Sequence, residues 1–133
     1  MDVTNGGHAA ALWVGLHLLL LLVLSALVVR QRQKHKILLG DEGIPQVAQA
    51  VRAFGNATEY IPAGLAGLIV LDLAGASPLL VHIAGAMLLI GRVTHAVGVS
   101  TSAGASVARS AGMTLTWLAY VFLIAATLFS AVL

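Results

Sequence analysis

Four long apolar segments, separated by short polar stretches, make up most of this chain. They cover about residues 8–29, 47–73, 79–99 and 111–133. Each segment reaches or exceeds the roughly 20 residues that a helix needs to cross the hydrocarbon of a bilayer. Only 9% of the residues are charged, whereas a soluble domain carries roughly a quarter. We therefore expect an all-α integral membrane protein in which residues 1–133 form a single four-helix bundle.

The basic residues predict how this bundle sits in the bilayer. With four spans, every Lys and Arg lies towards one side, and the positive-inside rule assigns that side to the cytoplasm. Both termini are then expected outside. The first apolar segment has no basic stretch before it and is followed by RQRQKHK, so we interpret it as a span and not as a cleaved signal peptide. The residues behind this prediction are Arg30, Arg32, Lys34, Lys36, Arg52, Arg92 and Arg109.

Several kinds of chemistry are excluded by composition. The chain has no cysteine, so disulfides, thiolate metal sites and a cysteine nucleophile are absent, and any thiol must come from a substrate. The five His are scattered without a ligand-like spacing, and we expect no metal site. The net charge is only +2 and aromatic residues are few, so we expect no nucleic-acid partner.

Three polar residues share one face of the second segment. Arg52, Asn56 and Glu59 stand at i, i+4 and i+7, which is the spacing of helix neighbours. Polar groups beside lipid are costly, so they usually face a bundle interior or a wet cavity and mark a functional site. Arg52 could hold a carboxylate and Glu59 an ammonium group, which together would bind a small zwitterion. The alternative is an internal ion pair that fixes helix packing.

Further candidates lie in the other segments. Arg92 is either a second cation for an anionic ligand or a side chain that snorkels to the interface. His95 follows it by one helical turn and is either a further functional side chain or a packing residue. Arg109 and Ser110 open the fourth segment, where they could stabilise a thiolate or an oxyanion. Their alternative roles are a basic flank and a helix cap. Tyr60 is an interfacial anchor or a ring that stacks on a ligand.

The second segment resembles a known family. The run RAFGNATEYIP keeps Arg52, Asn56, Glu59, Tyr60 and Pro62 at fixed spacing. It is similar to the second-helix signature of the MAPEG family, the membrane-associated proteins of eicosanoid and glutathione metabolism. The earlier GDEGIPQVAQAVR and the later GRVTHAVG fit the same family. The resemblance covers nearly the whole chain and is strongest to the short bacterial inner-membrane members.

This resemblance implies an assembly and a ligand. It implies a homotrimer that binds glutathione between neighbouring subunits, near the cytoplasmic face. Arg109 matches the arginine that activates the thiol in the eicosanoid branch, and Ser110 the serine beside it. Arg30 matches an arginine just after the first helix that reaches the neighbour's ligand, with Arg32 as the alternative. The remaining glutathione contacts that the resemblance implies are Arg52, Asn56, Glu59, Tyr60, Arg92 and His95.

The implied activity is that of a glutathione transferase or peroxidase. A lipophilic electrophile would arrive from the bilayer and meet glutathione at the protein. One alternative is a non-catalytic member of the family, because Val99 stands where the eicosanoid branch often has a tyrosine. Another is a small proton-coupled exporter that uses Glu59 as its coupling carboxylate, although Arg52 and Asn56 on the same face already offer that group partners.

Overall fold

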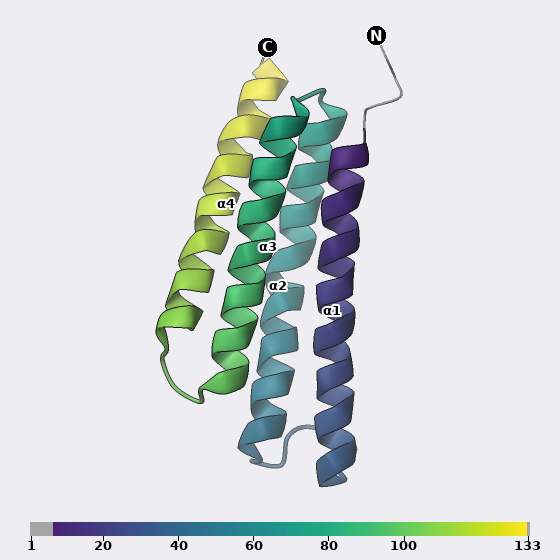
Figure 1. Ribbon diagram of the computed structural model, residues 1–133, viewed down its shortest axis with the longest axis vertical. Helices are drawn as coiled ribbons and strands as arrows, with labels where there is room; N and C mark the ends of the chain where they lie inside the picture. Colours follow the sequence, from purple (N-terminus) through teal and green to yellow (C-terminus); the bar gives the residue numbers. More distant parts are fainter. Residues whose placement is uncertain (1–6, 133) are drawn as a thin grey trace.

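Four antiparallel α-helices form the part of the chain that the computed structural model describes, residues 7–132 (Figure 1). The predicted end of the last segment at position 133 lies outside the described residues. The start of the first helix and the end of the last lie at the same end of the molecule (Figure 1). The helices are α1 (His8–His35), α2 (Pro45–Leu73), α3 (Pro78–Thr101) and α4 (Val107–Val132).

Helix α1 is longer than the apolar segment that predicted it. It continues past position 29 to His35, because Arg, Gln and Lys are good helix formers even where the apolar pattern has stopped. Lys36 ends the helix in a left-handed conformation, with φ at 58°. The basic run is therefore helical, and the connection to α2 is shorter than the polar stretch between the first two apolar segments.

Helix α4 begins earlier than predicted, at Val107. The hydroxyl of Ser106 accepts a hydrogen bond from the backbone N–H of Arg109, with 3.2 Å between nitrogen and oxygen. This is the geometry of a serine N-cap. The cap role considered for Ser110 thus belongs to Ser106, and Arg109 and Ser110 lie in the first turn of the helix.

The helices are those of a membrane-embedded bundle. By length and composition, α1, α3 and α4 are each able to cross a bilayer. Helix α2 has 29 residues but is not among them, because its first half carries several polar side chains. It packs against all three other helices, so these polar groups can turn towards protein instead of lipid. The all-α membrane bundle is confirmed, while the orientation of its termini stays a prediction.

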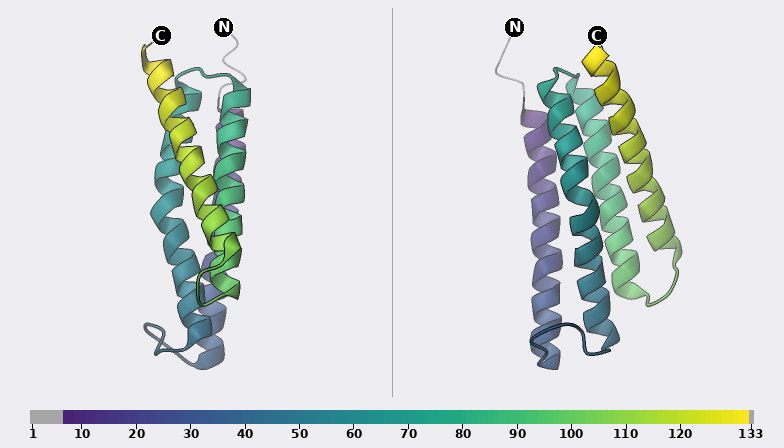
Figure 2. Two further views of the ribbon diagram at one scale, coloured as in Figure 1. Left: turned by 90° about the vertical axis from the view of Figure 1, so that its left-hand side faces the viewer. Right: turned by 180° about the vertical axis from the view of Figure 1, so that it is seen from behind.

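Helices α3 and α4 lie side by side (Figure 2), and glycines allow their backbones to approach closely. A Cβ atom added to Gly112 would lie 2.3 Å from the backbone nitrogen of His95. A Cβ atom at Gly98 would lie 2.5 Å from the backbone nitrogen of Arg109. Small residues allow such close backbone contact between helices in lipid. These two glycines bring His95 and Arg109 side by side.

We expect Gly112→Ala to loosen the α3–α4 pair. The added methyl group would meet backbone atoms, which cannot rotate away, and overpacking of this kind costs about 1–3 kcal/mol. Thermal unfolding in detergent measures the effect. The matched control is Gly15→Ala in α1, where an added Cβ meets nothing within 4 Å. Equal unfolding temperatures for the two variants would contradict the close contact.

Candidate functional site

A buried arginine stands at the centre of the bundle. Arg92 is only 1% exposed. Its Nε donates to the Thr116 hydroxyl at 2.9 Å, and its Nη1 donates to the Asn56 side-chain oxygen at 2.6 Å. The guanidinium also lies 5.0 Å from the centre of the Tyr60 ring. These contacts join α2, α3 and α4, and all the partners are neutral, so the positive charge of Arg92 is not cancelled by them.

The face shared by Arg52, Asn56 and Glu59 is divided in the structure. Arg52 Nη1 and Glu59 Oε1 are 3.2 Å apart, and both side chains are about half exposed. Asn56 is buried and turns to Arg92. One turn of an α-helix takes 3.6 residues. A residue four positions on therefore lies slightly past one full turn, and a residue seven positions on lies slightly short of two. Asn56 and Glu59 therefore lie on opposite edges of the predicted face.

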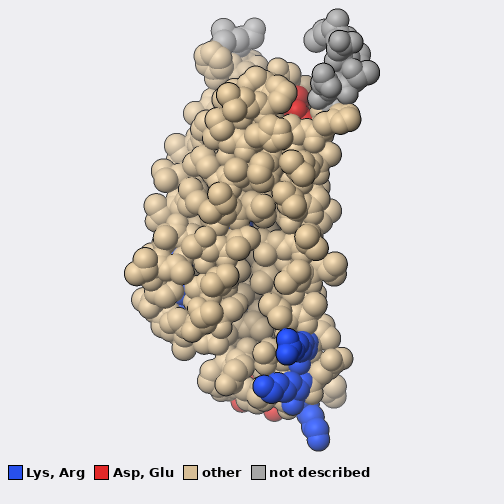
Figure 3. All heavy atoms as spheres, viewed as in Figure 1, with Lys and Arg blue, Asp and Glu red and all other residues tan. Residues whose placement is uncertain are grey.

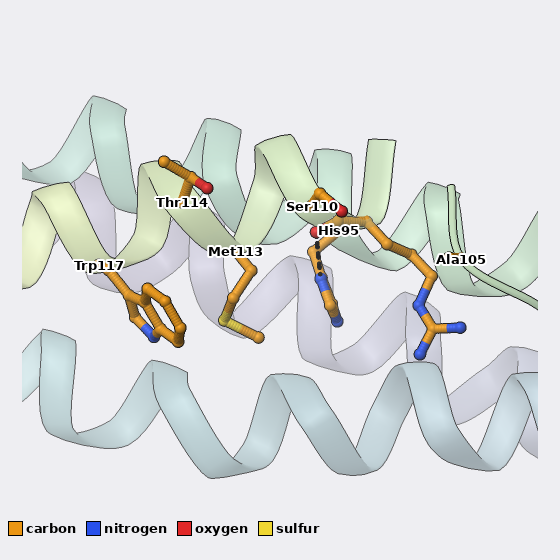
Figure 4. Close-up of a pocket in the computed structure, with 7 residues that line it drawn as sticks. His95, Ala105, Ser110, Met113, Thr114 and Trp117 are labelled. Atoms are coloured by element: carbon orange, nitrogen blue, oxygen red, sulfur yellow. Dashed lines mark hydrogen bonds between the residues drawn. The ribbon is translucent and has the colours of Figure 1, made fainter. Parts of the chain in front are cut away.

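A large open hollow lies along the first half of α4 (Figure 4). We call it the α4 hollow; its volume is about 490 Å³. His95 and Ser110 lie at one end of it and Trp117 at the other, with Met113 between them (Figure 4). The hollow thus has a polar end and an apolar end. Its lining residues are His95, Ala105, Arg109, Ser110, Met113, Thr114 and Trp117.

The polar end of the α4 hollow is held by two hydrogen bonds. His95 Nδ1 is 3.0 Å from the backbone oxygen of Arg109. Because a carbonyl oxygen only accepts, Nδ1 carries the proton in this bond. Arg109 Nη1 donates to the backbone oxygen of Gly104 at 2.9 Å. The α3–α4 loop therefore holds the Arg109 guanidinium at this end of the molecule.

A second, smaller hollow adjoins the same arginine. We call it the arginine hollow; its volume is about 220 Å³. Arg52 and Arg109 line it from α2 and α4, and Val99 lines it from α3. Arg109 also lines the α4 hollow, so one guanidinium borders both spaces. The full lining is Pro45, Ala48, Gln49, Arg52, Val99, Ser102, Ala103 and Arg109.

The candidate residues fall into three places. Arg52, His95, Arg109 and Ser110 line the two hollows. The Arg92 cluster, which we define as Asn56, Tyr60, Arg92 and Thr116, lies behind them among the helices. Arg30 on α1 and Glu59 on α2 are exposed and line neither hollow, although Glu59 pairs with Arg52.

Three residues of this region were not predicted from the sequence. Thr116 belongs to the Arg92 cluster, and Met113 and Trp117 form the apolar end of the α4 hollow. The available signal was helical spacing, because Met113 follows Ser110 by three residues and Trp117 follows Met113 by four, and residues at these intervals share one face of a helix.

Comparison with known proteins places the chain in a family. The MAPEG family model matches residues 10–129. Two similar proteins are both named inner membrane protein YecN, one from Escherichia coli strain K12 and one from Escherichia coli O6:H1 strain CFT073. Each is 36% identical over 119 residues, which cover 90% of this chain and 89% of the relative. No solved structure gives a significant match. The chain belongs to the MAPEG family, as the resemblance of its second helix predicted.

Proposed function

We propose that this protein is a glutathione transferase or peroxidase that acts on lipophilic electrophiles from the bilayer. The observation that carries the proposal is the position of Arg109 between the two hollows. One hollow offers cations and polar groups for a peptide, and the other offers an apolar surface. A thiol placed at Arg109 would face both reactants of a conjugation.

The charged groups fit glutathione, which has two carboxylates and one ammonium group. Arg52 lines the arginine hollow with a guanidinium group, which pairs well with a carboxylate, and Arg109 borders the same hollow beside the place proposed for the thiol. Glu59 stands beside Arg52 and supplies the one negative charge that an ammonium group needs. The α4 hollow, which would take the electrophile, has a volume of about 490 Å³ and so is within the usual size range of ligand pockets, roughly 300–1,000 Å³.

The protein's task in this reaction is to favour the thiolate. A free cysteine thiol has a pKa of about 8.5 and is a poor nucleophile while protonated. A cation close by stabilises the charged form and lowers the pKa. Arg109 is the candidate for this contact, and the buried charge of Arg92, whose hydrogen-bond partners are neutral, adds a potential of the same sign. Ser110 offers a hydroxyl hydrogen bond.

Bound glutathione would supply the thiolate sulfur, which forms a bond to the electrophile while the leaving group departs with the bonding electron pair. The chain contributes no covalent intermediate. Its second contribution is to bring a water-soluble and a lipid-soluble reactant together. The exposed Trp117 and the neighbouring Met113 give the electrophile an apolar surface beside Arg109.

The family resemblance extends the proposal to a homotrimer. In such an assembly a neighbouring subunit would cover part of each hollow, and its Arg30 would reach the ligand. The exposed position of Arg30 on α1 suits a contact with a second subunit. Within the described residues α4 packs against α2 and α3 but not against α1, which leaves both α1 and α4 with free faces for neighbours.

The proposal is tested by titrating glutathione into the purified protein in a calorimeter and then adding a generic aryl halide. Heat of binding followed by release of halide supports a transferase. Absence of binding heat refutes the proposal. Binding without conjugation would favour the non-catalytic alternative, for which the structure offers one observation: buried Val99 lines the arginine hollow and contributes no hydroxyl group. The exporter is disfavoured because Glu59 is already paired with Arg52.

We expect Glu59→Gln to weaken glutathione binding while leaving the fold intact. Loss of a charge-assisted hydrogen bond to the ammonium group costs about 1.5–3 kcal/mol, which is about ten-fold or more in affinity. The Arg52–Glu59 pair is about half exposed, and such a pair contributes at most about 1 kcal/mol to stability. Calorimetry and thermal unfolding measure the two effects. Normal binding combined with an unstable protein would mean that the pair is structural.

A further inference from the structure

The basic end of α1 is separate from both hollows. Helices α1 and α2 extend beyond the α3–α4 loop at one end of the molecule (Figure 2). Most of the Lys and Arg atoms visible in Figure 3 gather at this same end, where Asp or Glu atoms are visible as well. Arg32 and Lys36 are spaced by four residues, so their side chains lie on one side of the helix end.

These two cations border a third hollow, of about 400 Å³, which we call the basic hollow. Its lining combines cationic and amide side chains with aliphatic ones, and it shares no residue with the α4 hollow or the arginine hollow. Within one subunit it is therefore separate from the two hollows of the proposed glutathione site. The lining residues are Val29, Arg32, Gln33, Lys36, Ile37 and Leu38.

The cations of the basic hollow lack acidic partners. Arg52–Glu59 is the one ion pair within residues 7–132, so no carboxylate neutralises Arg32 or Lys36 there. Asp41 follows in the same connection, but its carboxylate accepts a hydrogen bond from the backbone of Gly43. The Nε atom of Arg32 is buried and has no hydrogen-bond partner among the described residues. The hollow therefore offers positive charge that no carboxylate of the described residues cancels.

Lys36 has a backbone conformation that is unusual for a lysine. Lys36 ends α1 with φ at 58°, a position where glycine is the usual residue because it alone has no Cβ penalty. A lysine here is less favourable for the backbone than glycine. What lysine supplies, and glycine cannot, is an ammonium group at the edge of the basic hollow.

The apolar part of the basic hollow continues onto the outer surface of the bundle. Leu38 and Leu39 are 96% and 84% exposed, although they directly follow the basic run. Val29 is exposed as well, and so are the α1 residues Leu18 and Leu22 farther along the helix. In a bilayer the outer face of α1 that carries Leu18, Leu22 and Val29 faces acyl chains, since α1 is long and apolar enough to cross the membrane. The ligand that suits such a place carries a negative head group and an alkyl chain.

We propose that the basic hollow binds an anionic phospholipid. The phosphate of the head group accepts hydrogen bonds from Arg32 and Lys36, and one acyl chain runs along Val29 and the outer face of α1. Basic residues next to a membrane span attract anionic lipid in general. Here only two of the four Lys and Arg residues in RQRQKHK, Arg32 and Lys36, line the hollow. Arg30 and Lys34 do not line it, which makes the assignment specific.

The test is native mass spectrometry of the detergent-purified protein, without glutathione, in the presence of phosphatidylglycerol. We compare Arg32→Gln/Lys36→Gln with Arg30→Gln/Lys34→Gln, which removes the same charge from the same helix end. The Arg32→Gln/Lys36→Gln variant is expected to bind lipid about ten-fold or more weakly than the wild type. The Arg30→Gln/Lys34→Gln variant is expected to bind lipid about as well as the wild type. Both variants should unfold at the wild-type temperature, because the cations make no ion pair within the described residues.

Two further binding measurements identify the chemical class of the ligand. Phosphatidylcholine with the same acyl chains should bind far more weakly than phosphatidylglycerol, because its head group carries no net charge. Glycerol 3-phosphate, which has the phosphate but no chain, should compete only weakly. Equal losses in the two double variants would overturn the proposal in favour of general charge attraction. Equal binding of both lipids, or competition by glycerol 3-phosphate as strong as by lipid, would overturn it as well.

Discussion

Arg109→Ala should lower the rate of glutathione conjugation by about 10²–10³-fold, the usual loss when one donor to a stabilised anion is removed. The reason is the place of Arg109, which borders both the arginine hollow and the α4 hollow. Affinity for glutathione should fall far less, because Arg52 and Glu59 are unchanged. Steady-state kinetics with a generic aryl halide separate the two effects as kcat and KM.

Arg109→Lys serves as the matched variant. It keeps the positive charge but loses the planar fork of the guanidinium, so it should recover part of the lost rate. If Arg109→Ala reacts as fast as the wild type, Arg109 is only a basic flank of α4. Ser110 and Arg92 would then be the next candidates for the thiol contact, and the non-catalytic alternative would gain support.

Asn56→Leu should destabilise the protein more than any change on the exposed Arg52–Glu59 pair. The Asn56 oxygen accepts a 2.6 Å hydrogen bond from Arg92, which is almost fully buried. Leucine has a similar size but no acceptor, so it leaves a buried charge without one of its partners. Loss of a hydrogen bond to a charged group costs about 1.5–3 kcal/mol.

Thermal unfolding of Asn56→Leu in detergent measures this cost, with Glu59→Gln as the control for a polar change in the same helix. A small shift for Glu59→Gln and a large one for Asn56→Leu are expected. The opposite ranking would show that the exposed pair, and not the Arg92 cluster, holds α2 in the bundle. It would also favour the hypothesis that Asn56 contacts glutathione directly, as the family resemblance implies.

The number and type of the helices could be predicted because each apolar run has the length of a membrane span. The ends of α1 and α4 could not be read from the same pattern. Residues 30–35 are polar yet helical, because helix propensity does not depend on apolar character. The start of α4 is set by Ser106, whose hydroxyl caps the Arg109 N–H, and a lone serine in a small-residue loop is a weak signal.

The candidate site was predictable only within single helices. The pairing of Arg52 with Glu59 follows from spacing along α2, and the structure contains it. The contact between Asn56 and Arg92 depends on how α2 packs against α3, which one helix does not encode. The position of Arg109 between the α4 hollow and the arginine hollow likewise depends on how α3 packs against α4, where Gly98 lies directly against the Arg109 backbone.

The central claim, that Arg109 stabilises the glutathione thiolate, is tested most directly by ultraviolet absorbance of the thiolate. The difference spectrum of bound against free glutathione is followed as pH rises, with no electrophile present. For the wild-type protein we expect the thiolate to appear at a pH clearly below the value of about 8.5 for a free cysteine thiol. In Arg109→Ala, with glutathione still saturating, the midpoint should return towards the free value. Identical titration curves for the two proteins would contradict the claim.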